Sequence, residues 1–536
     1  MLKLKSVSGN RPQQAKPISL NLKNLPLGSI FALGLALLAA LQLIRAFTAL
    51  FSPVVIDYSE MMVAGAAEQF RLSGNLGYMY APPTAPYGMP GVQYPPLFIL
   101  LTAGLNQLSG WGVILSERLL AWGLYVASGG LVGLIVGQET GRKWVAWVSA
   151  GIPFCFWGVI IFVHAGRVDP LALFLSLLAA FLYRRARLKQ KLSFGWLVGI
   201  SLLASAAFFS KQTYLAVNAA IFFDLLFCPQ KQPLSTNISR LKALRPNLKW
   251  AFGYALLFVA WTGFGLLLVG IATDRQFFGI FEPARAGSFI LQRVPGFISI
   301  FLLDHLPLLV LAGWMIFRQW RRGERFWPLY TLFAALACVT IIKDGAVDYY
   351  FNELSYVLSV SVGLAIAEAR KKGLEINPVT LKHWQHHTLV ALALLIQLGI
   401  ALGMLLGWSH WRDFDLSKRA YNEGLSLVRM AYAEEAQGGK PPLVLVDSFL
   451  LETGRARQVA DYFIYSVLLT NGKRDPAALV ADLDVGHYGM VITENFLRWP
   501  PSVEAALNKR YNLHIIYGDD GRKPYYVYTL RDNGKA

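Results

Sequence analysis

Two carboxylates that stand three residues apart, Asp57 and Glu60, are the side chains in this sequence best suited to do chemistry. On a helix they would share one face, and together they could act as a general base, hold a metal ion, or do both. The same spacing also describes a helix start, in which Asp57 caps a helix beginning near Tyr58 and Glu60 completes a capping box. Because the pair directly follows a long apolar run and precedes a long loop, we favour the functional interpretation.

Further charged residues lie at the ends of apolar segments. An ionisable residue at a membrane border is costly unless it is paired or hydrated, so such residues are functional candidates by default. Ordinary alternatives stay open: Arg167 could form a salt bridge with Asp169, and Lys211 could snorkel to the interface. His164 could be a structural hydrogen-bonding residue. The full set is His164, Arg167, Asp169, Lys211, Asp304, His305, Lys343, Asp344, Asp348 and Glu353.

Long apolar runs must position these residues. The chain has 536 residues, of which 55% are hydrophobic and 15% charged, with a mean hydropathy of +0.43. A soluble domain of this length could not bury so much apolar surface. We therefore expect an α-helical polytopic membrane protein with about 11 transmembrane helices. The predicted spans are 28–50, 114–137, 145–163, 169–184, 193–209, 213–228, 250–272, 304–319, 326–342, 354–369 and 388–408.

The basic residues indicate the orientation. The formal net charge is +18, and the charges are scattered between the apolar runs, which disfavours a nucleic-acid surface. Lys and Arg concentrate in cytoplasmic loops, so the clusters at 142–143, 184–189, 231–249, 318–325 and 370–372 are predicted to be cytoplasmic. The candidate charges then converge on the opposite, outer face.

One apolar segment, Tyr94–Leu108, is too short to span comfortably, and counting it as a span would put basic clusters on the wrong side. We predict that it is a juxtamembrane helix on the outer face. The resulting domains are a cytoplasmic tail (1–27), a transmembrane domain (28–408) with a first outer loop (51–113), and an outer α/β domain (409–536).

The outer domain is predicted from a change of pattern. Short apolar runs at 442–447, 488–493, 513–517 and 525–529 are typical of strands, and the last two flank a Gly-Asp-Asp-Gly turn, which predicts a hairpin. A helical stretch is expected at 501–511.

Short motifs resemble a known family. Asp57-Tyr-x-Glu60, Gly74-Asn-Leu-x-Tyr78 and Tyr94-Pro-Pro-Leu97 follow one another as in the first loop of GT-C-type polytopic glycosyltransferases, which include the lipid A aminoarabinose transferases and protein O-mannosyltransferases. At Asp348 the family pattern leads us to expect Asn, which leaves the role of this residue open. The resemblance covers nearly the whole membrane part and, more loosely, the outer domain; it includes Arg167-Val-Asp169, Ser210-Lys-Gln-Thr213 and Gly345 to Glu353.

The resemblance implies a polyprenyl-phosphate-linked sugar as donor, reaction at the outer face and inversion of the anomeric carbon. A base must then take the proton of the acceptor hydroxyl; Asp57 is the first choice and Glu60 the second, unless Glu60 orients the acceptor or holds a divalent metal with Asp57. The leaving phosphate needs cations more than an acid. The candidates are Arg167, Lys211 and Lys343, with Arg167 favoured for bidentate contact; further site candidates are Tyr94, His164, Asp169, Asp348 and Glu353.

Two other function classes stay open. A transporter or flippase for a lipid or small solute would call for internal pseudo-symmetry and ionisable residues near the midplane, whereas the charges here gather at one face. A non-catalytic envelope assembly factor is the third option. The expected partners are a lipid-linked donor, membrane lipids and a glycan, lipid or protein acceptor, with no nucleic acid. The expected location is the plasma (inner) membrane, multi-pass, with a cytoplasmic N-terminus and the C-terminal domain outside.

Overall fold

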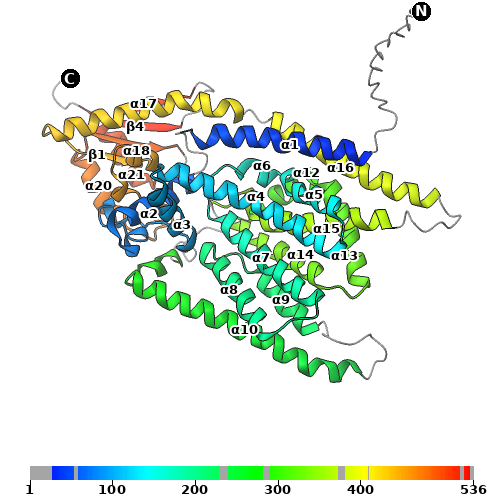
Figure 1. Ribbon diagram of the computed structural model, residues 1–536. Coiled ribbons are helices and arrows are strands. Elements are labelled where there is room, and N and C mark those ends of the chain that lie inside the picture. The colour runs from blue at the N-terminus through cyan, green and yellow to red at the C-terminus, as the bar shows by residue number, and fades with distance from the viewer. Residues whose placement is uncertain are drawn as a thin grey trace, which may run out of the picture.

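The computed structural model describes residues 27–52, 58–227, 239–281, 290–343, 345–371, 381–407, 410–495, 497–518 and 524–531. Asp57 and Asp344, two of the residues singled out above, lie outside these ranges. Most of the described chain is helical, and a small sheet lies near the C-terminal end of the chain (Figure 1).

Helices occupy all eleven segments predicted as spans. They run side by side in the large body of Figure 1, apart from the sheet-containing domain at one end. The helices are α1 (Leu27–Leu50), α4 (Val113–Thr140), α5 (Lys143–Gly151) with α6 (Trp157–Phe162), α7 (Asp169–Leu188), α8 (Phe194–Ser210), α9 (Ala216–Phe227), α10 (Ser239–Ala272), α13 (Leu306–Arg321), α14 (Phe326–Ala337), α15 (Asn352–Lys371) and α16 (Leu381–Gly407).

The number of spans is not confirmed at eleven. Among the described residues, five helices are long and apolar enough to cross a membrane. A sixth span results if α12 (Val294–Asp304) and α13, which meet at an 84° bend, count as one. Several of the other predicted segments fall short because their helices are short or broken: α8 and α9 have 17 and 12 residues, and a 3-10 turn at Ile152–Cys155, which contains Pro153, separates α5 from α6.

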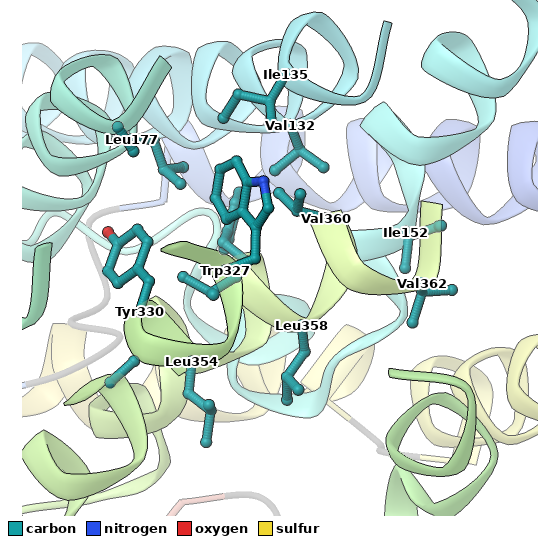
Figure 2. Packing of buried hydrophobic residues seen from close by; sticks show 14 of the residues in the cluster. Val132, Ile135, Ile152, Leu177, Trp327, Tyr330, Leu354, Leu358, Val360 and Val362 are labelled. Atoms are coloured by element: carbon teal, nitrogen blue, oxygen red, sulfur yellow. The ribbon is translucent and has the colours of Figure 1, made fainter. Parts of the chain in front are cut away.

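The centre of the helical body is α15, which packs against α4, α5, α13, α14 and α16. Its span is 94% buried, whereas the span of α10 is only 6% buried. Small residues allow the close approach: a Cβ on Gly363 would lie 2.3 Å from the Ser149 hydroxyl of α5. Beside α15, Trp327 and Tyr330 of α14 fill the space toward Leu177 and Val132 (Figure 2). The helix near the candidate site is thus held by protein on all sides.

The C-terminal domain contains a four-stranded sheet in the order β1–β2–β4–β3. The predicted strands are confirmed as β1 (Pro442–Leu445), β2 (Met490–Glu494), β3 (Tyr511–Ile516) and β4 (Tyr525–Leu530). The predicted hairpin is also confirmed, since β3 and β4 pair antiparallel with Leu513 opposite Tyr528, while β1 and β2 pair in parallel. The helices of this domain are α17 (His410–Ala436), α18 (Asp447–Glu452), α19 (Tyr462–Thr470), α20 (Ala477–Asp484) and α21 (Pro501–Arg510).

The first outer loop folds into α2 (Tyr58–Ser73), two 3-10 turns (Leu76–Met79 and Pro86–Gly88) and α3 (Leu97–Ser109). The segment predicted to be a juxtamembrane helix is therefore helical; it packs against α2 and α4. Figure 1 places α2 and α3 beside the sheet domain.

Hydrogen bonds join this loop to the C-terminal domain. Gln69 Nε2 donates to the carbonyl oxygens of Ala456 (3.0 Å) and Val459 (2.8 Å), and Tyr87 OH donates to Asp482 at 2.7 Å. The contact is close, because a Cβ on Gly65 would lie 2.3 Å from a Val459 methyl carbon. The loop and the domain therefore form one packed unit at the end of the helical body.

Candidate functional site

Glu60 lies in the first turn of α2 and forms a buried ion pair. Its two oxygens accept hydrogen bonds from Arg118 of α4 at 2.7 and 2.9 Å, and one also accepts from the Gly166 amide at 2.8 Å. Both side chains of the pair are fully buried. A bidentate arginine-carboxylate contact fixes position as well as charge, so Glu60 anchors the start of α2.

The same arginine holds the end of α1. Arg118 Nη1 donates to the carbonyl oxygens of Ala49 and Ser52, each at 2.6 Å. Ser52 and Glu60 flank Asp57 in the sequence, so the chain on both sides of the predicted base is tied to one side chain. Asp57 itself lies outside the described residues.

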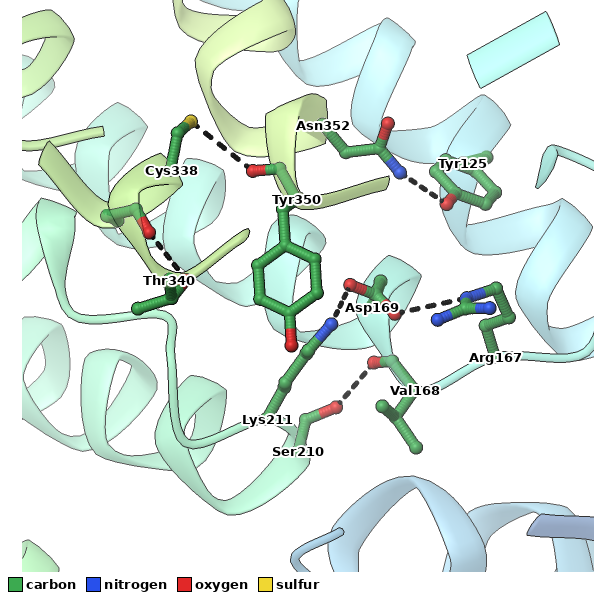
Figure 3. A network of polar contacts seen from close by, with 11 residues as sticks. Tyr125, Arg167, Val168, Asp169, Ser210, Lys211, Cys338, Thr340, Tyr350 and Asn352 are labelled. Carbon is green, nitrogen blue, oxygen red and sulfur yellow. Dashed lines mark hydrogen bonds and ion pairs between the residues drawn. The ribbon is translucent and has the colours of Figure 1, made fainter. Parts of the chain in front are cut away.

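A second charged cluster joins three of the sequence motifs (Figure 3). Asp169, at the start of α7, accepts from Lys211 Nζ at 2.5 Å and from Arg167 Nε at 3.3 Å. The Arg167 guanidinium carbon lies 3.5 Å from the ring centroid of Tyr349, and Lys211 Nζ lies 4.3 Å from the same centroid. Cation–π contacts of this kind strengthen when desolvated. The salt bridge considered for Arg167 is present, and Lys211 pairs with Asp169 inside the protein.

A cavity of about 290 Å³ lies beside this cluster, near the lower end of the usual ligand-pocket range. Its wall combines polar side chains with an apolar portion that includes Ile280, Phe281, Val339 and Ile342. The lining also includes Met62, Gln93 and Tyr94 of the first loop, Lys211, Gln212 and Thr213, Thr340, Lys343, Gly345, Tyr349 and Tyr350, and Asp461 and Ile464 of the C-terminal domain.

Lys343 differs from the other two predicted phosphate ligands. Its ammonium group makes no hydrogen bond or ion pair with any residue that the structure describes, although it lines the cavity. Burial lowers the pKa of Lys343 from its ordinary value, and the nearby Asp461 carboxylate acts in the opposite sense. A partly buried cation that has no partner in the described part of the chain is suited to bind an anion.

The remaining candidates lie apart from this cavity, with one exception. Tyr94 lines the cavity. Glu353 is buried in the helical core, where it accepts from Tyr330 OH at 3.0 Å, and His164 is buried in the loop after α6. Asp348 begins the 3-10 turn Asp348–Phe351 next to Gly158. These three are not among the residues that line the cavity.

Three residues of this region were missed from the sequence: Arg118, Tyr349 and Asp461. The sequence could have indicated Arg118, because an ionisable residue inside an apolar run is itself a functional candidate. Tyr349 stands within a noted motif, but an aromatic ring there could equally be a core residue. For Asp461 the local sequence offers no pointer to a cavity whose other walls are formed by distant segments.

Nothing among the described residues forms a group of three His, Cys, Asp or Glu side chains suited to a metal ion. The one described member of the predicted metal pair, Glu60, has both oxygens committed to Arg118. A divalent ion at Glu60 would have to displace an arginine, so the residues present fit that role poorly.

Comparison with known proteins supports the family resemblance at the level of the fold. No protein-family model matches the sequence, and no curated protein matches it significantly. Among solved structures, ArnT from Cupriavidus metallidurans bound to undecaprenyl phosphate aligns with a TM-score of 0.55 and 14% identity, over 93% of this chain and 98% of that one. The apo form of ArnT aligns with a TM-score of 0.51.

The oligosaccharyltransferase of Archaeoglobus fulgidus in its apo form aligns with a TM-score of 0.54 and 12% identity, over 96% of this chain and 75% of that one. ArnT, an aminoarabinose transferase, and the archaeal enzyme are both GT-C membrane glycosyltransferases. The resemblance identified from the motifs is thus confirmed at the level of the fold: the chain has the GT-C fold with a small C-terminal sheet domain, and five of its described helices are long and apolar enough to cross a membrane.

Proposed function

We propose that the protein is a glycosyltransferase that moves a sugar from a polyprenyl-phosphate carrier to an acceptor hydroxyl, with inversion at the anomeric carbon. The observation that carries the proposal is the cavity in which Lys343 has no ionic partner among the described residues, in a fold whose solved relative ArnT has undecaprenyl phosphate bound. Its mixed lining suits a ligand with a charged phosphate and an apolar chain.

The lysine, its neighbouring cations and the apolar wall have different roles in the proposed reaction. Lys343 binds the carrier phosphate and stabilises the charge that develops as the glycosidic bond breaks. Lys211, which also lines the cavity, and Arg167, which lies over the ring of Tyr349, add a weaker positive potential, because Asp169 neutralises part of their charge. The apolar wall near Ile280 and Phe281 takes the first part of the lipid.

Asp57 is the proposed base that removes the proton of the acceptor hydroxyl. Glu60 is a positioning residue rather than a second base, since both of its oxygens are bound to Arg118. The acceptor is proposed to be a glycan, a lipid or a protein. The proposed location of the protein is the plasma (inner) membrane.

The test compares Asp57→Asn and Lys343→Gln with Lys509→Gln, a control whose lysine forms an exposed pair with Asp484. Purified full-length protein is assayed with synthetic undecaprenyl-phosphate sugars. Asp57→Asn should reduce kcat by about 10²- to 10⁴-fold with folding unchanged. Lys343→Gln should weaken undecaprenyl phosphate binding about 10- to 100-fold, and Lys509→Gln should match the wild type.

A protein that binds undecaprenyl phosphate yet transfers no sugar would be a carrier-binding assembly factor or a flippase, and the proposal would be withdrawn. Full activity in Asp57→Asn would remove the base.

The proposed orientation has its own test. Ser502 is an exposed residue of α21, and Ser193 is an exposed residue that follows the basic cluster at 184–189. In a cysteine-free background, a cysteine at 502 should react with a membrane-impermeant thiol reagent added to intact cells. A cysteine at 193 should react only after permeabilisation. The reverse pattern would overturn the outer-face assignment.

A further inference from the structure

Asp461 is a buried carboxyl group that the C-terminal domain contributes to the cavity. It precedes α19 as the N-cap residue, and its Oδ1 accepts from the Ile464 amide at 2.9 Å. The side chain is 1% exposed. Its second oxygen, Oδ2, has no hydrogen-bond partner among the residues that the structure describes. Leaving a buried acceptor unpaired costs free energy, so a group that pairs with it from outside the chain is favoured.

The backbone around Asp461 keeps the carboxyl group in place. The Asp461 amide donates to the Pro90 carbonyl of the first loop at 2.7 Å, and Ile464, one turn later, also lines the cavity. The cap through Oδ1 removes the remaining rotational freedom. Burial raises the pKa of Asp461 to about 7, so above that pH its ionised Oδ2 is a fixed acceptor on the wall that also carries Lys343.

The surroundings limit what can pair with Oδ2. A phosphate would meet a carboxylate of like charge, while Lys343 offers it a better place on the same wall. An ammonium group would have to lie beside the Lys343 ammonium. A neutral hydroxyl avoids both conflicts and supplies the donor that Oδ2 lacks.

We propose that Asp461 is a specificity-determining residue whose Oδ2 accepts a hydrogen bond from a hydroxyl group of the transferred sugar. This inference rests on the proposed function, because it places the carrier phosphate at Lys343 and the sugar next to it, toward the C-terminal domain. The outer domain thereby selects the sugar while the helical body holds the carrier. A site built to hydrogen-bond a hydroxyl discriminates strongly against an analogue that lacks it.

The test uses variants that keep the helix cap. Asp461→Ser retains a capping oxygen for Ile464 and removes Oδ2, and Asp461→Asn retains the cap and replaces Oδ2 with an amide donor. The control is Asp475→Ser, because Asp475 is an exposed residue of the same domain whose side chain also accepts from a backbone amide near a helix start, that of Ala477 at 2.9 Å. Full-length protein is assayed with the best substrate from a panel of undecaprenyl-phosphate-linked hexoses and pentoses, and with its monodeoxy analogues.

In the wild type, one deoxy analogue should lose about 10- to 100-fold in kcat/KM relative to the parent donor. Asp461→Ser should lose a similar factor with the parent donor and none with that analogue. Asp461→Asn should recover part of the loss, since an amide can donate to a hydroxyl oxygen. If the sugar is instead bound through an ammonium group, Asp461→Asn should not recover activity. Asp475→Ser should behave as the wild type.

Undecaprenyl phosphate without sugar separates this inference from the proposed function. Asp461→Ser should bind it as tightly as the wild type, whereas Lys343→Gln should not. If Asp461→Ser weakens the binding of the sugar-free lipid and of the sugar-linked donor equally, Asp461 acts on the phosphate. The inference is then overturned, while the glycosyltransferase proposal stands. If the wild type neither binds the lipid nor transfers a sugar, the proposed function itself fails.

Discussion

Two places in the molecule bury ionisable side chains, and they differ in how the charges meet. At the start of α2, Glu60 and Arg118 face each other through two short hydrogen bonds. In the cavity, Lys343 and Asp461 share a wall, yet they form no ion pair in the part of the chain that the structure describes. A closed pair, whose two members bind each other, stabilises the fold, because removing one member leaves a buried charge. An open pair leaves both partners ready for a ligand. Stability and activity should therefore respond differently to changes at the two places.

The largest effect is expected at the closed pair. Arg118→Ala leaves Glu60 without its cation and releases the carbonyl oxygens of Ala49 and Ser52. The free energy of unfolding should fall by about 3–5 kcal/mol, read as a large drop in Tm of the detergent-purified protein. Arg118→Lys should recover only part, because lysine lacks the planar fork.

The control for that loss is Arg71→Ala, since Arg71 forms only a partly exposed pair with Glu68. Its cost should be about 0–1 kcal/mol. Equal Tm values for Arg118→Ala and Arg71→Ala would contradict the architectural role of Arg118.

An intermediate effect is expected within the second cluster. Lys211→Met removes a buried partner of Asp169, but Arg167 still contacts that carboxylate, so the expected cost is about 1–3 kcal/mol. Lys343→Met removes no ion pair and should cost less than about 0.5 kcal/mol. Thermal unfolding of the two variants side by side checks this contrast. A larger decrease in Tm for Lys343→Met than for Lys211→Met would contradict it.

The smallest effect concerns pH and the C-terminal domain. Burial raises the pKa of Glu494 to about 8 and that of Asp461 to about 7, and burial also raises the pKa of Asp447, with help from these two carboxylates. Lys343 partly opposes the shift at Asp461. The folded domain keeps these protons where the unfolded chain has lost them, so its stability should decline as pH rises from about 4 through about 8, the pKa of Glu494.

Glu494→Gln removes one of these protonation sites and should flatten that decline by a few degrees in Tm across the same range. Thermal scans of the full-length protein from pH 5 to 9 measure both curves. An unchanged slope in Glu494→Gln would mean that this carboxyl does not carry the dependence.

Sequence patterns predicted the elements well where the physics is local. Apolar runs predicted the helices, and the turn at 518–521 between two short runs predicted the β3–β4 hairpin with its partners. The clustering of Arg167, Asp169 and Lys211 followed from placing charged residues on one face of the bilayer. Local pattern did not reveal which helices are long enough to span, because helix ends and breaks such as the one at Pro153 depend on packing.

The candidate site was predicted in part. Lys343 and Tyr94 were expected and line the cavity. Glu60 was given a chemical role because its partner, Arg118, is 58 residues away and was counted as part of an apolar span. Asp461 was missed because its place depends on the C-terminal domain docking against the first loop, which no local periodicity encodes.

That docking has a consequence for how the protein comes to be made. Gln69 and Tyr87 are bonded to residues 387 to 395 positions later in the chain. The ribosome adds about 5–20 residues each second, so tens of seconds pass between synthesis of the loop and of the surface on which it finally rests. During that interval the helices can insert and pack, but the first outer loop, whose sequence includes Asp57, lacks the C-terminal surface against which it finally packs. The proposed glycosyltransferase activity should therefore arise abruptly, with the last fifth of the synthesis of the chain, rather than gradually as helices accumulate.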